Sequence, residues 1–120
     1  MSKQNLPKQS EKGIQDFILN YLEINRIGFF WRNNTGAMKT MSGFMKFGKV
    51  GSADILGVLE GRFVAIECKR QGKKNLDEAQ EKFRYELESS GGIYYLANNV
   101  DSALVWIKEL RHILKNNLNS

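Results

Sequence analysis

The chain has 120 residues, which is enough for one domain with a single hydrophobic core and too few for two. Hydrophobic residues make up 42% of the sequence and proline occurs once, so we expect a globular fold and exclude a disordered chain. The formal net charge of +5 favours a polyanionic partner, most simply nucleic acid; a generically basic protein is the alternative.

Cysteine and histidine content excludes two kinds of site. One cysteine, Cys68, and one histidine, His112, allow neither a disulfide framework nor a Cys/His zinc site, and we expect His112 on the surface. The chain has no apolar run of about 18 residues and no signal-peptide pattern. We therefore expect an intracellular, cytoplasmic protein without membrane contact.

The first predicted element is a helix. Ser10 is a suitable N-cap, and the apolar residues after it recur at helical spacing, which predicts an amphipathic helix from residue 11 to about residue 25. The aromatic run 29–31 predicts a short strand. Residues 33–52 contain four glycines and no hydrophobic period, so we expect a long loop, and loops of this length are often functional.

Two strands and a tight turn come next. Residues 55–59 and 62–66 flank Glu60 and Gly61, which suit a two-residue hairpin turn. Both strands are apolar on both faces, and this pattern predicts a central position in a covered sheet.

The remaining elements alternate between helix and strand. Asn75 as N-cap and Glu78 as its capping-box partner predict a second helix that stops at Gly91. A strand at 93–97 and a last helix over residues 100–114 follow. The order α-β-β-β-α-β-α predicts a single α/β domain with a mixed central sheet flanked by helices. The expected parts are a loose segment at 1–9, the domain at 10–116 and a tail at 117–120.

The predicted hairpin brings two acids together. Leu59 faces Arg62 across the turn, so opposed positions sum to 121 and Asp54 falls opposite Glu67, on the same face of the sheet. Two opposed carboxylates repel each other unless a cation offsets them, and Mg²⁺ favours carboxylate oxygens. Lys69 lies two residues after Glu67 and shares its face.

This combination suits phosphodiester chemistry. Mg²⁺ can polarise a phosphoryl oxygen and activate a water, and a lysine can stabilise the charge that develops on the phosphate. Taken alone, Glu67 and Lys69 also fit a solvated ion pair at a strand end, with Asp54 ending a loop.

Several short segments together resemble a nuclease family. The segments are Ser10–Gln15, Trp31–Gly36, Gly51–Gly57, Ile66–Lys69 and Gln80. Their types and order resemble the VRR-NUC branch of the PD-(D/E)XK nucleases over about residues 10–110. The chain departs from the parent signature at Ala53, where that signature has proline, which affects backbone stiffness more than chemistry.

The resemblance implies a restriction-endonuclease-like fold and a deoxyribonuclease that hydrolyses phosphodiester bonds with Mg²⁺ or Mn²⁺. It implies metal binding by Asp54, Glu67 and the backbone carbonyl of Cys68, with Glu11 completing the site directly or through a water. Gln80 supports the site in this family. The expected catalytic residues are Glu11, Asp54, Glu67, Lys69 and Gln80.

The sequence pattern around these residues agrees with those roles. Glu11 precedes Ile14 by three positions and lies on the buried stripe of its helix, although a first-turn glutamate favoured by the helix dipole is the alternative. Gln80 lies on an apolar stripe and needs partners if buried; alternatively it reaches solvent at the helix boundary. The Cys68 thiol points away from Glu67 and is expected in the core.

The region between Glu23 and Asp54 has no acidic residue and several basic ones. Lysines neutralise phosphates, and an exposed Phe44 or Phe47 can stack on a base or wedge into a distorted duplex. The alternative is that the aromatic residues fold back onto the core. The expected nucleic-acid-binding residues are Arg32, Asn33, Lys39, Lys46, Lys49, Arg70, Lys73 and Lys74.

Small stand-alone members of the resembled family imply structure-selective cutting of branched DNA, such as four-way (Holliday) junctions. Symmetric cutting of two strands needs two sites, so we expect a homodimer, in a bacterial or phage-infected cell, with no organic cofactor. The alternative function is a non-catalytic nucleic-acid-binding module that keeps the nuclease fold.

Overall fold

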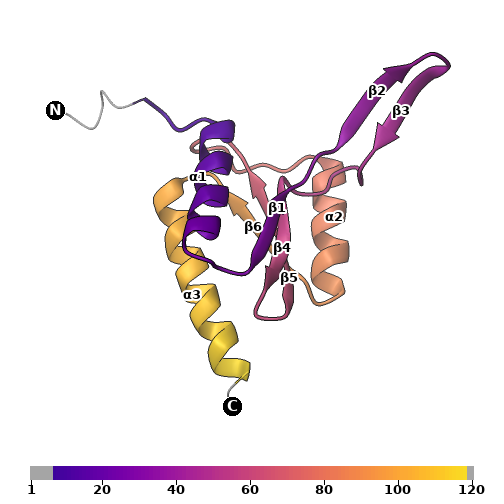
Figure 1. Cartoon of the computed structure of the whole chain (residues 1–120). Coiled ribbons are helices and arrows are strands. Elements are labelled where there is room, and N and C mark those ends of the chain that lie inside the picture. The colour runs from indigo at the N-terminus through magenta and orange to yellow at the C-terminus, as the bar shows by residue number, and fades with distance from the viewer. Residues whose placement is uncertain (1–6, 119–120) are drawn as a thin grey trace.

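The structure, a computed structural model, describes residues 7–118 (Figure 1). The helices are α1 (Glu11–Ile24), α2 (Glu78–Ser89) and α3 (Val100–Leu118). The strands are β1 (Phe29–Arg32), β2 (Gly36–Thr40), β3 (Gly43–Phe47), β4 (Ile55–Leu59), β5 (Arg62–Cys68) and β6 (Ile93–Ala97). Residues 1–6 of the expected loose segment and 119–120 of the expected tail lie outside the described residues.

The central sheet is mixed, as expected, and has helices on both sides. Its strand order is β1-β4-β5-β6; β4 is antiparallel to both β1 and β5, and β6 is parallel to β5. Figure 1 shows α1 and α3 on one side of this sheet and α2 on the other. The expected single α/β domain is therefore confirmed.

The β4–β5 hairpin has the predicted register. Leu59 pairs with Arg62 and Ile55 pairs with Ile66, so opposed positions sum to 121 along the whole ladder. Glu60 and Gly61 both have positive φ, +48° and +80°, as a type I′ turn requires. The two strands occupy the centre of the sheet, and this position confirms the expectation drawn from their apolar faces.

Apolar side chains fill both sides of the sheet. On one side, Ile14, Ile18 and Leu22 of α1 are buried against the strands and α3, in the stripe that the helical spacing predicted. On the other side, Phe83 and Leu87 of α2 cover a smaller cluster. The Cys68 thiol belongs to the larger cluster and His112 is exposed, both as expected.

The prediction of a loop over residues 33–52 was wrong. This stretch contains a separate two-stranded sheet, β2–β3, which projects from the body of the domain (Figure 1). Among the residues whose burial is described, all its strand residues are exposed except Thr40, which is half-buried. Without a buried face, the strands lack the apolar alternation by which a half-buried strand is recognised. The element order is therefore α-β-β-β-β-β-α-β-α.

The start of the second helix also differs from the prediction. Asp77, not Asn75, is the N-cap of α2, because its side chain accepts a hydrogen bond from the Gln80 backbone N–H at 2.8 Å. The Gln80 side chain accepts in return from the Asp77 N–H at 2.9 Å. This reciprocal pair satisfies two backbone donors at once, which the Asn75–Glu78 spacing does not do here. The first helix begins as expected, with Ser10 accepting from the Gly13 N–H at 3.0 Å.

Candidate metal centre

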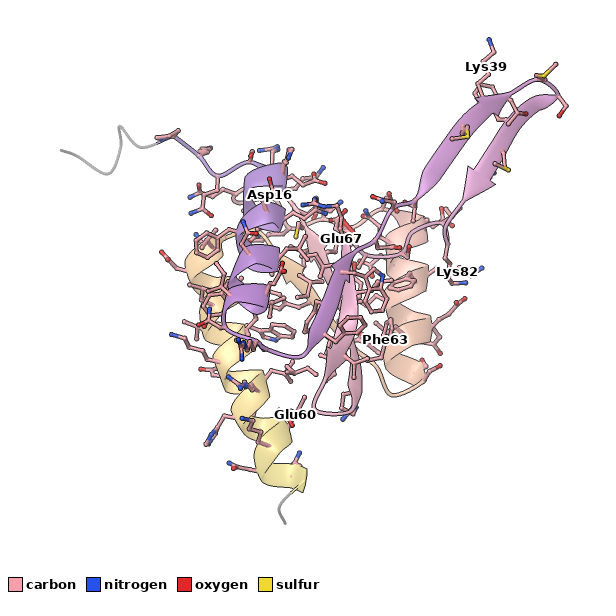
Figure 2. The ribbon with its side chains drawn as sticks, in the orientation of Figure 1. Asp16, Lys39, Glu60, Phe63, Glu67 and Lys82 are labelled. Carbon is pink, nitrogen blue, oxygen red and sulfur yellow. The ribbon has the colours of Figure 1, made fainter. Side chains whose placement is uncertain are left out.

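Three carboxylates converge at one end of the central sheet. One oxygen each from Glu11, Asp54 and Glu67 lie within 4.8 Å of one another. Glu11 opens α1, Asp54 directly precedes β4 and Glu67 lies near the end of β5. Figure 2 shows Glu67 between α1 and α2. The strand register predicted correctly that Asp54 and Glu67 lie together. Glu11, the third acid, comes from α1 on the opposite side of the sheet.

Glu67 is the most deeply buried of the three acids. Its exposed fraction is 3%, and burial, followed by the adjacent Asp54 carboxylate, raises its pKa from 4.5 to about 9. Asp54 accepts a hydrogen bond from the Cys68 backbone N–H at 2.7 Å, so its carboxylate is held against β5. In the metal-free protein this arrangement disfavours ionised Glu67, whereas a bound cation would favour it.

The donor set fits a hard divalent cation. All three side chains offer oxygen, and carboxylate oxygens are the ligands that Mg²⁺ and Mn²⁺ prefer. Among the described residues, no histidine or thiolate joins the cluster, because His112 is exposed on α3 and burial raises the pKa of the Cys68 thiol. The centre therefore suits Mg²⁺ or Mn²⁺ better than zinc.

Lys69 is buried beside the acids and held by one partner. Its exposed fraction is 8%, and its Nζ donates to Gln80 Oε1 at 3.0 Å. The same Gln80 oxygen accepts the Asp77 N–H, so the capping box of α2 also orients the lysine. Gln80 is half-buried near the start of α2, and its Oε1 accepts hydrogen bonds from both Lys69 and Asp77.

Arg32 and Asn33, which were both expected to bind nucleic acid, are engaged in contacts within the protein. Arg32 contacts Gln15 and forms an ion pair with Asp16 at 2.6 Å, which lowers the pKa of that acid. The Asn33 side chain donates to Ser52 Oγ at 2.7 Å, and its backbone N–H donates to the Asp54 carbonyl at 2.7 Å. Asn33 therefore helps to position the backbone of Asp54, a role that no sequence pattern indicated.

The six lysine and arginine residues that remain are exposed and fall into two groups. Lys39 and Lys46 lie on the projecting hairpin, and Lys49 lies at its base, 4.0 Å from Glu86. Arg70, Lys73 and Lys74 follow the end of β5 that carries Glu67. In the chain, the first group precedes Asp54 and the second group follows Glu67.

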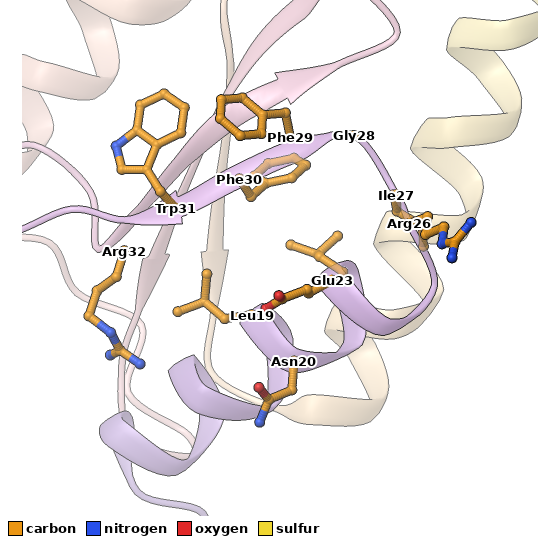
Figure 3. Close-up of a pocket in the computed structure, with 11 residues that line it drawn as sticks. Leu19, Asn20, Glu23, Arg26, Ile27, Gly28, Phe29, Phe30, Trp31 and Arg32 are labelled. Carbon is orange, nitrogen blue, oxygen red and sulfur yellow. The ribbon is translucent and has the colours of Figure 1, made fainter.

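A separate groove of about 590 Å³ lies between α1 and β1 (Figure 3). Its lining includes Glu23 and Arg26, and Figure 3 shows Phe30 towards α1 while Phe29 and Trp31 lie on the other side of the strand. None of the three clustered acids lines this groove, so it is distinct from the candidate metal centre.

Tyr94 is a further buried polar residue near the centre that the sequence analysis missed. It pairs with Ala65, two residues before Glu67, so it faces the same side of the sheet. Among the described residues, its buried hydroxyl has no hydrogen-bond partner, and burial raises its pKa. The Tyr94 ring packs against Phe83 in the smaller apolar cluster, on the side of the sheet that carries Glu67.

Comparison with known proteins gives no assignment. Neither the known protein-family models nor the curated proteins contain a match to this chain. Within residues 7–118, the helices include none with the length and apolar character to cross a membrane. The function is therefore inferred from the geometry of the site.

Proposed function

We propose that the chain is a metal-dependent DNA endonuclease of the VRR-NUC type, with a restriction-endonuclease-like fold, which cuts branched DNA such as four-way junctions. The observation that carries this proposal is the convergence of Glu11, Asp54 and Glu67 within 4.8 Å, beside the buried Lys69. Structural ion pairs seldom bury an acid and a base together at a strand end, because burial penalises both charges.

Asp54, Glu67, Glu11 and the backbone carbonyl of Cys68 would hold Mg²⁺ or Mn²⁺. When bound, the cation would supply an activated water and polarise the scissile phosphate. Asp54 is kept in place by the Cys68 N–H, and Asn33 fixes the backbone just before β4. These contacts preorganise the ligands, so little rearrangement is needed when substrate arrives.

Lys69 would act on the substrate directly. Its ammonium group lies on the same face as Glu67, and the Gln80 oxygen limits its direction. A charged donor in this place would stabilise the negative charge that develops on the phosphate during attack. Gln80 is therefore a positioning residue in this proposal, acting through Lys69.

The alternative is a nucleic-acid-binding module without catalysis. The exposed lysines on the hairpin and after β5 serve both functions equally, since phosphate contacts alone give DNA affinity. A binding module has no need of a buried lysine next to three acids, an arrangement that costs stability. This difference favours the enzyme.

A homodimer is part of the same proposal, because two sites are needed to cut two strands. Support comes from an apolar row on the α2 side of the sheet, at its β1 edge. Phe29, Val58 and Phe63 are direct cross-strand neighbours, and all three are exposed, as is Trp31 beside them. Exposed apolar patches of this kind are typical of protein interfaces, and we assign this one to a second copy of the chain.

The proposal is tested with labelled four-way junctions, flaps, hairpins and linear duplexes, each incubated with Mg²⁺ or Mn²⁺. We expect cleavage of branched DNA, loss of at least about 100-fold in rate for Asp54→Asn and Glu67→Gln, and a normal rate for the control Glu109→Gln, an exposed acid on α3. DNA binding without cleavage by either metal would favour the non-catalytic module. Cleavage of matched RNA alone would contradict the assignment to DNA.

A further inference from the structure

The projecting β2–β3 hairpin has two chemically different faces. Met38 pairs with Met45 on one face, and both side chains are 53% exposed. On the other face Lys39 pairs with Phe44, and Lys46 is the next residue along that face because strand side chains alternate. One face is thus apolar, and the other places an aromatic ring between two lysines.

The cationic face is fully presented to solvent. Phe44 is 78% exposed, and both lysines are exposed without an acidic neighbour in the hairpin. Figure 2 shows Lys39 near the tip, well away from the body of the domain. Lys39 and Lys46 are diagonal neighbours, which places them about 7–8 Å apart along the ribbon.

The base of the hairpin is tied to the candidate metal centre. Asn33, just before β2, donates hydrogen bonds to Ser52 and to the Asp54 carbonyl. These bonds join the segment that precedes the hairpin to the segment that follows it. After β3, Gly51 lies against the Ala79 backbone of α2, where a Cβ atom would approach the Ala79 oxygen to 2.3 Å. The hairpin therefore leaves the domain at a fixed point beside the acids.

We propose that the face formed by Lys39, Phe44 and Lys46 binds DNA at a branch point. This inference rests on the proposed function and adds how the branched substrate is chosen. The two lysines contact phosphates, and Phe44 stacks on a base whose own stacking is interrupted. Charge complementarity supports this partner, because the face carries two positive charges and no acid.

The aromatic ring explains the preference for a branch over continuous duplex. Within a stacked duplex the faces of the bases are covered, whereas at a junction they are accessible to an aromatic side chain. A two-stranded ribbon can also enter the major groove of intact duplex, but that mode reads base edges and gains little from an exposed phenyl ring. Phe44 therefore favours junctions, and the lysines favour DNA of any shape.

The test measures binding without cleavage, in EDTA, using a four-way junction and a linear duplex of the same sequence. In the junction, 2-aminopurine at the branch reports stacking. We expect wild-type protein to quench the 2-aminopurine fluorescence by stacking Phe44 on that base. Phe44→Ala should abolish this quenching and lower the preference for junction over duplex by about tenfold. Lys39→Ala/Lys46→Ala should weaken binding to both DNAs and lower the salt slope by about two, one for each phosphate contact.

The matched control is Met38→Ala/Met45→Ala on the opposite face of the same strands. We expect this variant to keep the wild-type affinity, preference and quenching. The inference is overturned if Phe44→Ala leaves the preference unchanged, or if the methionine variant loses it instead. Because binding is measured without metal, these results are independent of the nuclease test. If wild-type protein fails to cleave DNA but shows a Phe44-dependent preference for junctions, the proposed nuclease activity is rejected and the proposed binding face is retained.

Discussion

At the scale of single residues, the burial of Glu67 ties the stability of the metal-free protein to pH. Burial, followed by the adjacent Asp54, raises the pKa of Glu67 in the folded protein to about 9, whereas in the unfolded chain this pKa returns to its ordinary value of 4.5. The stabilisation that comes from the protonated Glu67 is therefore complete below pH 4.5, and it is lost as the pH rises towards 9. In EDTA we therefore expect a lower thermal midpoint at about pH 8 than at about pH 5, measured by calorimetry.

Metal and substitution separate this effect from general titration of the protein. Mn²⁺ at about pH 8 should restore the lost stability, because the cation favours the ionised carboxylate. Glu67→Gln should flatten the pH dependence and abolish the Mn²⁺ effect, while the control Glu109→Gln behaves as wild type. A Glu67→Gln variant that keeps the full pH dependence would show that other groups cause it.

Lys69 is expected to act in the transition state and contribute little to ground-state binding. Lys69 is buried and its Nζ donates to Gln80, so the direction of its ammonium group is restricted. Lys69→Ala should reduce the single-turnover cleavage rate by about 100-fold or more and leave DNA affinity within about threefold. Gln80→Ala should lose less, about tenfold, because the lysine remains but its direction is less restricted.

Two results would change the role assigned to Lys69. A Lys69→Ala variant that cleaves at a normal rate would remove the residue from the mechanism. Equal losses of affinity and rate would make Lys69 a simple phosphate contact, since uniform binding does not accelerate the chemical step.

At the scale of elements, prediction succeeded where local pattern and burial agree. The α1 stripe and the β4–β5 register follow from spacing alone, and the register brought Asp54 to Glu67. The β2–β3 hairpin was missed because neither of its faces is buried, so its strands carry no apolar alternation. The α2 cap was misplaced by two residues because Asp77 and Gln80 match the capping box as well as Asn75 and Glu78 do.

The site was predictable only in part for a related reason. Asp54, Glu67 and Lys69 share one hairpin and one face, so counting along two strands relates them. Glu11 arrives from α1, and only a family resemblance connected it to the other acids. Asn33 acts through backbone and side-chain hydrogen bonds to the β4 end, which depend on tertiary structure and leave no periodic signal.

The base of the hairpin offers an element-scale prediction. Gly51 has φ +81°, and an added Cβ would lie 2.3 Å from the Ala79 carbonyl oxygen. Gly51→Ala should therefore destabilise the protein by more than about 2 kcal/mol in urea unfolding, since both the conformation and the contact are unfavourable. The matched control is Gly72→Ala, with φ +86° but open space around the added atom, which should cost only about 1 kcal/mol.

The difference between the two glycine variants isolates the contact with α2. Gly51→Ala should also reduce the cleavage rate of the proposed enzyme, because Asp54 is only three residues further along the chain and would move with the displaced backbone. If both variants lose the same stability, the close approach of Gly51 to Ala79 has no energetic consequence, and the hairpin base is not fixed by α2.

At the scale of the whole molecule, one acid cluster is found among the described residues, so the proposed enzyme would have one metal centre in each chain. Resolving a junction requires a cut in each of two strands, so the proposed dimer has a direct kinetic consequence. A dimer with one wild-type subunit and one Asp54→Asn subunit should nick one strand and fail to make the second cut. The variant subunit keeps its hairpin and its lysines, and it should still bind the junction.

The experiment uses a four-way junction in a supercoiled plasmid, which distinguishes the nicked circle from the linear product of two cuts. Wild-type protein should give linear product, the Asp54→Asn homodimer should give neither, and separately tagged, copurified mixed dimers should accumulate nicked circles. Val58→Asp and Phe63→Asp place a charge in the apolar row that we assign to the second copy. Each variant should sediment as a monomer, and its cleavage product should be the nicked circle alone. Linear product from the mixed dimer at the wild-type rate would mean that one site cuts both strands in turn, and the dimer would then be unnecessary for resolution.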